Sequence, residues 1–140
     1  KGYIEGLRQA KIEISEDMFF QGSYDQEAGR AGCEYFMGKD SMPTALICAS
    51  DNIAFGALDY AKDHGVSCPS DISIIGFDDG PWASACSPKL TTVRQPLGAL
   101  TVRAVEIMMQ TVAVVDANYR ERVNLSAVLN ISGSTSHPPK

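Results

Sequence analysis

The chain has 140 residues, of which 44% are hydrophobic and 21% are charged, and its formal net charge is -5. This length and composition predict one soluble globular domain with a proper core, and they exclude disordered and fibrous chains. The negative charge argues against direct binding of this chain to the phosphates of nucleic acid. No window approaches the roughly 18 consecutive apolar residues of a membrane span, and the sequence opens without a signal-peptide pattern.

The cysteines are too widely spaced for a metal or redox motif: Cys33, Cys48, Cys68 and Cys86. Zinc sites and thioredoxin-like sites use close Cys-x-x-Cys pairs, so we expect reduced structural thiols in a cytoplasmic protein. The two histidines, His64 and His137, have no neighbouring cluster of acidic residues or cysteines. We therefore expect neither a histidine-based metal site nor a catalytic triad, and no cofactor.

The pattern of apolar residues predicts an alternation of helices and strands. In chain order we expect a helix at residues 2–10, a strand at 18–22, a helix at 25–39, a strand at 44–49, a helix at 52–64 and a strand at 72–77. Short connectors between them predict right-handed crossovers, and hence an α/β fold with an open parallel sheet flanked by helices on both faces. The unalternated apolar runs of the last two strands agree, because parallel strands are buried on both sides.

Local signals mark the ends of two helices. Asp25 is a good N-cap for the second helix, and Gly65 stands where a left-handed cap ends the third. Four residues of the second helix predict its buried side: Ala28, Ala31, Tyr35 and Phe36.

The chain changes character after Asp79. Glycines and prolines punctuate a long connection that still contains the β-favouring residues 90–93. Residues 97–115 then predict a strong helix that is apolar on more than one stripe and needs partners on two sides. A small sheet domain offers too little surface to such a helix. Residues 122–131 predict a last strand, and a polar tail follows it.

Two of the expected strands end in polar side chains, which predicts a binding crevice. Ligands of open parallel sheets sit outside the carboxyl ends of the strands. Ser50, which follows strand 44–49, is the better ligand contact. Either Ser50 or Asp51 can cap the next helix, and capping is our main interpretation of Asp51. Adjacent strand residues point to opposite sides, so we expect Asp78 to face the crevice and Asp79 to order the loop.

Three aromatic residues have a second interpretation each. Tyr24 follows strand 18–22, where its ring can stack on a sugar or base or pack on its own helix at the rim. Trp82 either lines the crevice or plugs the loop after Asp79 against the sheet. Phe55 lies off the apolar stripe of its helix, and forms either a contact between subunits or a second core face.

The sequence contains no phosphate loop, no dinucleotide fingerprint and no nucleophile elbow. An enzyme would have to use Asp51, Asp78 and Asp79 as a magnesium and phosphoacceptor cluster, as receiver domains do. Such a cluster needs a lysine at a later strand end, and Lys89 lies in a loop instead. We therefore expect a binding protein without catalysis.

Three blocks of sequence closely resemble the effector-binding core of lactose/galactose-repressor-type (LacI/GalR family) transcription regulators. They are residues 43–58, 65–79 and 88–96, in that order and spacing, and together they are highly specific. The tail at residues 130–135 is similar to that family's closing segment, although Ser132 stands where an arginine is common. The resemblance covers nearly the whole chain.

This resemblance implies the C-terminal part of a periplasmic-binding-protein-like domain of type I, in a cytoplasmic homodimer. Its effector, a sugar or nucleoside-like metabolite, binds between two subdomains and changes the DNA affinity of an N-terminal helix-turn-helix headpiece, which this chain lacks together with most of the first subdomain. Carried over by position, the effector-binding residues are Tyr24, Ser50, where the family often has Asn, and Asp78.

The resemblance also predicts how the chain is divided between the subdomains. Residues 1–92 and 122–136 belong to the C-terminal subdomain, residues 93–121 cross to the N-terminal subdomain and form its helix, and residues 137–140 are a tail. The alternative is a periplasmic-type sugar-binding protein with the same fold. Because one wall of the cleft is largely missing, we expect this chain alone to bind effector weakly or not at all.

Overall fold

The computed structural model describes residues 1–114 and 121–138. The helices are α1 (Gly2–Gln9), α2 (Gln26–Met37), α3 (Asp51–Asp63) and α4 (Leu97–Val114), with short 3-10 helices η1 (Glu16–Met18) and η2 (Pro81–Ser84). The strands are β1 (Ala45–Ile47), β2 (Ser73–Asp78), β3 (Thr91–Arg94) and β4 (Val128–Asn130). Within the described ranges, none of these helices has the length and apolar character needed to cross a bilayer.

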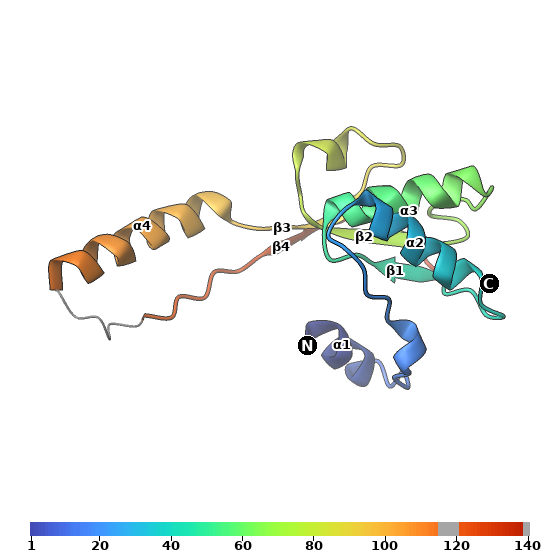
Figure 1. Ribbon diagram of the computed structural model, residues 1–140, viewed down its shortest axis with the longest axis horizontal. Helices are drawn as coiled ribbons and strands as arrows, with labels where there is room; N and C mark the ends of the chain where they lie inside the picture. Colours follow the sequence, from blue (N-terminus) through green and yellow to red (C-terminus); the bar gives the residue numbers. More distant parts are fainter. Residues whose placement is uncertain (115–120, 139–140) are drawn as a thin grey trace.

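The four strands form one sheet in the order β1-β2-β3-β4. β1, β2 and β3 run parallel, with Leu46 opposite Ile74 and Ile75 opposite Thr91. This confirms the predicted parallel sheet flanked by helices. β4 pairs antiparallel with β3, because the chain comes back from the far end of α4 (Figure 1). The predicted last strand is paired over three residues only.

Glycines allow α2 and α3 to pack in close backbone contact. A Cβ atom on Gly29 would lie 2.0 Å from the carbonyl oxygen of Ile53, and one on Gly56 would lie 1.9 Å from that of Gln26. Both glycines are therefore required at the crossing. The predicted buried side of α2 is confirmed for Ala28, which is buried, and for Phe36, which packs against the core, but Tyr35 is exposed. Gly29 is buried instead, and hydrophobic periodicity does not register glycines, so it missed this part of the face.

The core lies between α3 and the buried side of the sheet. Its buried members are Cys33, Leu46, Cys48, Ala54, Ala57, Ala61, Ile72, Ile74, Ala83 and Leu90. All four cysteines are free, and burial raises the pKa of the Cys48 thiol to about 12. The opposite side of β1 is more open, and Ile47 is 61% exposed there.

Three helix ends show which capping predictions hold. Asp25 caps α2 by accepting a hydrogen bond from the Ala28 N–H at 2.9 Å, and Gly65 ends α3 with φ +72°, both as predicted. The predicted cap of α3 is wrong for Asp51. Ser50, whose backbone is extended, is the N-cap and accepts from the Ile53 N–H at 3.3 Å.

The predicted strand at residues 18–22 is not formed. The 3-10 helix η1 ends at Met18, and the extended backbone after it is paired with none of the described strands. Its aromatic rings pack on helices instead: the Phe19 ring lies 5.5 Å from the Tyr3 ring of α1, and the Phe20 ring lies 5.6 Å from the Tyr35 ring of α2. Without a neighbouring strand to pair with, this segment connects η1 to α2 and packs its aromatic rings on the helices.

The chain after β4 is fastened to the sheet through Ser134. Its hydroxyl donates to the Ile74 carbonyl at 2.6 Å and accepts from the Thr91 N–H at 2.8 Å, and the residue is fully buried. Its carbonyl accepts from the Ile74 N–H. One serine therefore links β2 and β3 at the end of the sheet away from their carboxyl termini.

Helix α4 projects away from the sheet on two connections, one leaving β3 and one returning to β4 (Figure 1). We call residues 93–96, which leave β3, and residues 121–130, which return through β4, the stalk. Met109 and Val112 are 62% and 72% exposed, which fits the prediction that the helix lacks partners here. Residue 115, the predicted end of the helix, lies outside the described residues, as do residues 116–120 of the crossover and 139–140 of the tail.

Candidate functional site

The three parallel strands end at one edge of the sheet, and polar residues gather there. Ser50 follows β1, Asp78 ends β2, and Gln95 follows β3. This is the edge at which an open parallel sheet binds ligands. We call this group of strand ends, with the turn after β2, the carboxyl edge.

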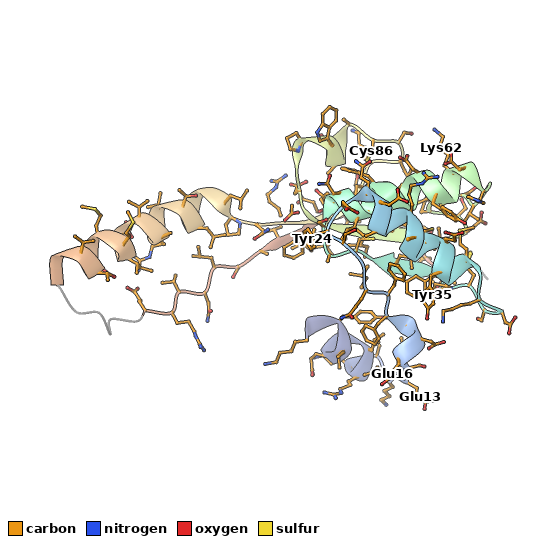
Figure 2. All side chains as sticks on the ribbon, viewed as in Figure 1. Glu13, Glu16, Tyr24, Tyr35, Lys62 and Cys86 are labelled. Atoms are coloured by element: carbon orange, nitrogen blue, oxygen red, sulfur yellow. The ribbon has the colours of Figure 1, made fainter. Side chains whose placement is uncertain are left out.

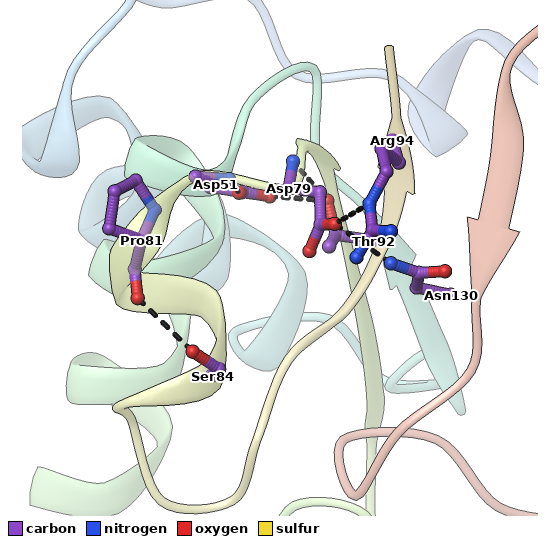
Figure 3. Close-up of polar contacts among 8 residues, drawn as sticks. Asp51, Asp79, Pro81, Ser84, Thr92, Arg94 and Asn130 are labelled. Atoms are coloured by element: carbon purple, nitrogen blue, oxygen red, sulfur yellow. Dashed lines mark hydrogen bonds and ion pairs between the residues drawn. The ribbon is translucent and has the colours of Figure 1, made fainter. Parts of the chain in front are cut away.

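Asp51 organises the carboxyl edge from inside. It is 5% exposed, and its Oδ1 accepts from the Thr92 hydroxyl at 2.6 Å while its Oδ2 accepts from the Gly80 N–H at 2.8 Å (Figure 3). Gly76 makes room for it, because a Cβ there would lie 2.4 Å from Asp51 Oδ1. The carboxylate therefore ties the start of α3 to β3 and to the turn after β2.

Ser50 is enclosed at this edge. It is buried, and its hydroxyl oxygen already accepts the capping bond of α3. A hydroxyl oxygen has two lone pairs and one proton, so capping leaves it able to bind a second group. Its role toward an effector stays a prediction.

The two adjacent aspartates at the end of β2 have separate partners. Asp78 Oδ1 accepts from the Gln95 side-chain amide at 2.7 Å. Asp79 accepts from the Arg94 guanidinium and, at 2.8 Å, from the Asn130 amide, and its N–H donates to the Thr92 hydroxyl. The Asp79 carboxylate therefore binds β3 and β4, and its ordering of the loop after β2 stays a prediction. That Asp78 faces an effector stays a prediction.

Tyr24 lies at the same edge. Its hydroxyl donates to the carbonyl of Ala49, the residue before Ser50, while the residue as a whole is 66% exposed. Figure 2 shows it at the end of the sheet from which the stalk leaves. The structure thus places Tyr24 beside Ser50 with most of its surface open, and its stacking role stays a prediction.

Trp82 and Phe55 each have two predicted roles. Trp82 lies in η2 and is 72% exposed, so it does not plug the loop; the neighbouring Ala83 is the buried residue of that turn. Its place in a crevice stays a prediction. Phe55 is half-buried and packs against the core, which supports the second core face, and its contact with a partner subunit stays a prediction.

Of the hollows that the described residues line, two that lie beside the sheet are not lined by Tyr24, Ser50 or Asp78. One, of about 380 Å³, is apolar and lies between α1 and Ile47. The other, of about 180 Å³, lies on the Asp79 side of the turn; it is lined by Asp79, Ala83, Ser84, Lys89, Leu90, Arg94, Asn130, Ile131 and Ser132. Among the described residues, no three His, Cys, Asp or Glu side chains are grouped as metal ligands.

Sequence reasoning missed several residues of this edge. Gln95 and Arg94 stand at the carboxyl end of the third parallel strand, so the rule that singled out Ser50 and Asp78 also applies to them. Thr92 carries a polar hydroxyl in the β-favouring run at residues 90–93, and a hydroxyl that is buried in a strand needs a hydrogen-bond partner. No local signal marks Asn130, because its partner Asp79 is far away in the sequence.

Known proteins have sequences similar to that of this chain. Residues 1–135 match the family model of the periplasmic binding protein-like domain. The chain is 37% identical over 123 residues to the ribose operon repressor of Haemophilus influenzae, an alignment that covers 88% of this chain and 37% of the relative. It is 35% identical over 113 residues to the HTH-type transcriptional regulator GalS of Salmonella typhimurium, covering 81% of this chain and 33% of the relative.

Solved structures of similar proteins superpose well. The transcription regulator CcpA of Lactococcus lactis has a TM-score of 0.84 at 30% identity, covering 96% of this chain and 49% of that one. A LacI-family regulatory protein from Chloroflexus aggregans has a TM-score of 0.83 at 31% identity, covering 97% and 49%. The chain thus spans about a third of these curated relatives and about half of these solved structures.

Proposed function

Because the chain belongs to the periplasmic binding protein-like domain family, in the form found in LacI-family transcriptional regulators, we propose that it is the effector-sensing part of such a regulator. It binds a small metabolite without catalysis and passes the binding on as a conformational change. Ligands act in this way by contacting one of two arrangements more favourably, which shifts the population between them.

The carboxyl edge carries the proposal. A hydroxyl from Ser50, a carboxylate from Asp78 and an open aromatic ring from Tyr24 come from the ends of neighbouring segments. Carboxylates and hydroxyls bind ligand hydroxyls, and an aromatic face stacks on the apolar side of a sugar or base. A sugar or a nucleoside-like compound is therefore the effector class we propose.

The exposed helix α4 supports a two-lobed arrangement. Its apolar surface lies away from the sheet and needs another packing surface, as the exposure of Met109 shows. We infer that residues 93–121 belong to a second lobe and that residues 1–92 and 122–136 form the lobe described here. The effector binds between the lobes and closes them.

Dimerisation and DNA binding belong to the same proposal. Phe55 on α3 is the residue we assign to contact a second copy. It packs against the core but stays partly exposed, and an exposed apolar surface on a helix suits a helix-to-helix contact between subunits. DNA is bound through an N-terminal headpiece, because a chain with net charge -5 is unsuited to phosphates. We infer that this regulator acts in the cytoplasm. The alternative of a periplasmic-type sugar-binding protein is not favoured, since the similar proteins are named as regulators.

Calorimetry of the intact protein against D-ribose, D-galactose and a set of nucleosides and nucleobases tests the proposal. Replacing a carboxylate that accepts from ligand hydroxyls costs about 1.5–3 kcal/mol, so Asp78→Ala is expected to weaken the bound compound about tenfold or more. Asp40→Ala removes an exposed carboxylate elsewhere and serves as the control. Unchanged affinity in Asp78→Ala would exclude Asp78 from the site.

A further inference from the structure

We propose that Asp79 is a positioning residue, which latches both strands of the stalk to the turn that presents Asp78. The proposal rests on the function proposed above, since it concerns how the position of α4 and the effector site are coupled. It starts from the backbone of the turn and from the origin of each side chain that holds it.

The turn has an unusual backbone conformation. Asp78 has φ +117° and Asp79 has φ +55°, so two consecutive residues with side chains lie in the region that favours glycine. Such a backbone conformation is strained and persists only when its surroundings hold it. The direction of the Asp78 carboxylate therefore depends on the contacts that hold this turn.

The body of the domain supplies the backbone contacts. The Asp79 N–H donates to the Thr92 hydroxyl at 3.2 Å, and the Gly80 N–H donates to Asp51 Oδ2 at 2.8 Å. The Thr92 hydroxyl in turn donates to Asp51 Oδ1. These bonds fix where the turn begins and ends.

The stalk supplies the contacts to the two carboxylates. Arg94 at the end of β3 and Asn130 on β4 both donate to Asp79 Oδ2 (Figure 3). Gln95, two residues before α4, donates to Asp78. A single carboxylate oxygen thus holds the strand that leaves for α4 and the strand that returns from it.

Coupling follows from this shared oxygen. A displacement of α4 moves its two connections, and these pull on Asp79 and with it on the strained turn that carries Asp78. Linkage is reciprocal, so a ligand that fixes Asp78 also restricts the stalk. A purely structural role for Asp79 would instead stabilise the whole sheet. A variant would then increase local opening throughout the sheet, whereas loss of the latch would increase it at the turn alone.

Hydrogen exchange of the intact protein without effector distinguishes these roles. Asp79→Asn keeps a side chain that tolerates positive φ, and Asn130→Val removes one tether while it keeps a good strand residue. In both variants we expect hydrogen exchange at the backbone amides of residues 79 and 80 to be about tenfold faster, because local opening becomes easier. Exchange at the backbone amide of Ile74 in the core should not change.

The control is Arg30→Ala, which removes the exposed Arg30–Asp63 ion pair and is expected to leave exchange of the turn as it is. Trp82, the single tryptophan, lies just after the turn. The efficiency with which acrylamide quenches its fluorescence is therefore expected to differ from the wild type in Asp79→Asn and to equal it in the control. Unchanged exchange at the turn in both variants, or equal acceleration at Ile74, would overturn the latch. The measurement uses no effector, so loss of Asp78 as a ligand residue would leave its outcome unaffected.

Discussion

Asp51→Asn is expected to destabilise the protein far more than the same exchange at an exposed aspartate. The Asp51 carboxylate is buried and accepts one hydrogen bond on each oxygen, from Thr92 and from the Gly80 N–H. Asparagine keeps the shape but replaces one oxygen with an NH2 group, which cannot accept. If this NH2 group faces Thr92, the proton of the Thr92 hydroxyl loses its acceptor; if it faces Gly80, two N–H donors meet.

The size of the effect follows from these two bonds. A hydrogen bond to a charged group contributes about 1.5–3 kcal/mol, and the variant loses one bond and the charge of the other, so we expect a loss of about 2–4 kcal/mol. With a urea dependence of about 2 kcal/mol per M, the unfolding midpoint should fall by about 1–2 M. Urea titration followed by circular dichroism measures this shift.

Asp63→Asn is the matched control, because it makes the same chemical change in an exposed ion pair with Arg30. Exposed pairs contribute little to stability, so its midpoint should stay close to that of the wild type. Equal midpoints for the two variants would refute the inference that Asp51 holds the carboxyl edge together.

Two further predictions concern Ser134, which fastens the chain after β4, and Asp25, which caps α2. Ser134→Ala should lower the free energy of unfolding by about 1–3 kcal/mol, because the buried Thr91 N–H loses its partner, whereas Ser136→Ala at an exposed position should have less effect; urea titration compares them. The capping bond from the Ala28 N–H lowers the pKa of Asp25 below its ordinary value of 3.8. The ionised Asp25 cap therefore stabilises the fold above pH 3.8, and this stabilisation is lost as the pH falls through the lower pKa of the folded state. Asp25→Ala should destabilise the protein at pH 7 and progressively less below pH 3.8. Thermal unfolding measured across this pH range tests this expectation.

The parallel core was predictable because its signals are local. An apolar run that ends in Ser50-Asp51, a helix that ends at Gly65 and a second apolar run that ends in Asp78-Asp79 each declare a strand or helix by themselves. Their order and short connectors leave a right-handed parallel arrangement as the natural topology. The position of the carboxyl edge followed from this topology alone.

The strand expected at residues 18–22 failed for a non-local reason. A strand exists only as part of a ladder, and aromatic residues such as Phe19 and Phe20 pack equally well on helices. The part of the buried side of α2 that was predicted wrongly has a related reason. Whether Gly29 is buried depends on the approach of α3, which composition and periodicity do not encode.

The division of labour between Ser50 and Asp51 shows what a sequence leaves open at a site. Both residue types cap helices, and the extended backbone of Ser50 places the cap there, one residue before the helix. Asp51 is thereby free to reach Thr92 and Gly80, which no sequence spacing suggests, since these partners come from another strand and from the turn after β2. The side of the edge that we propose faces the effector thus depends on a buried carboxylate behind it. Substitutions at Asp51 and Asp79 should therefore alter the response to effector although neither residue is expected to touch it.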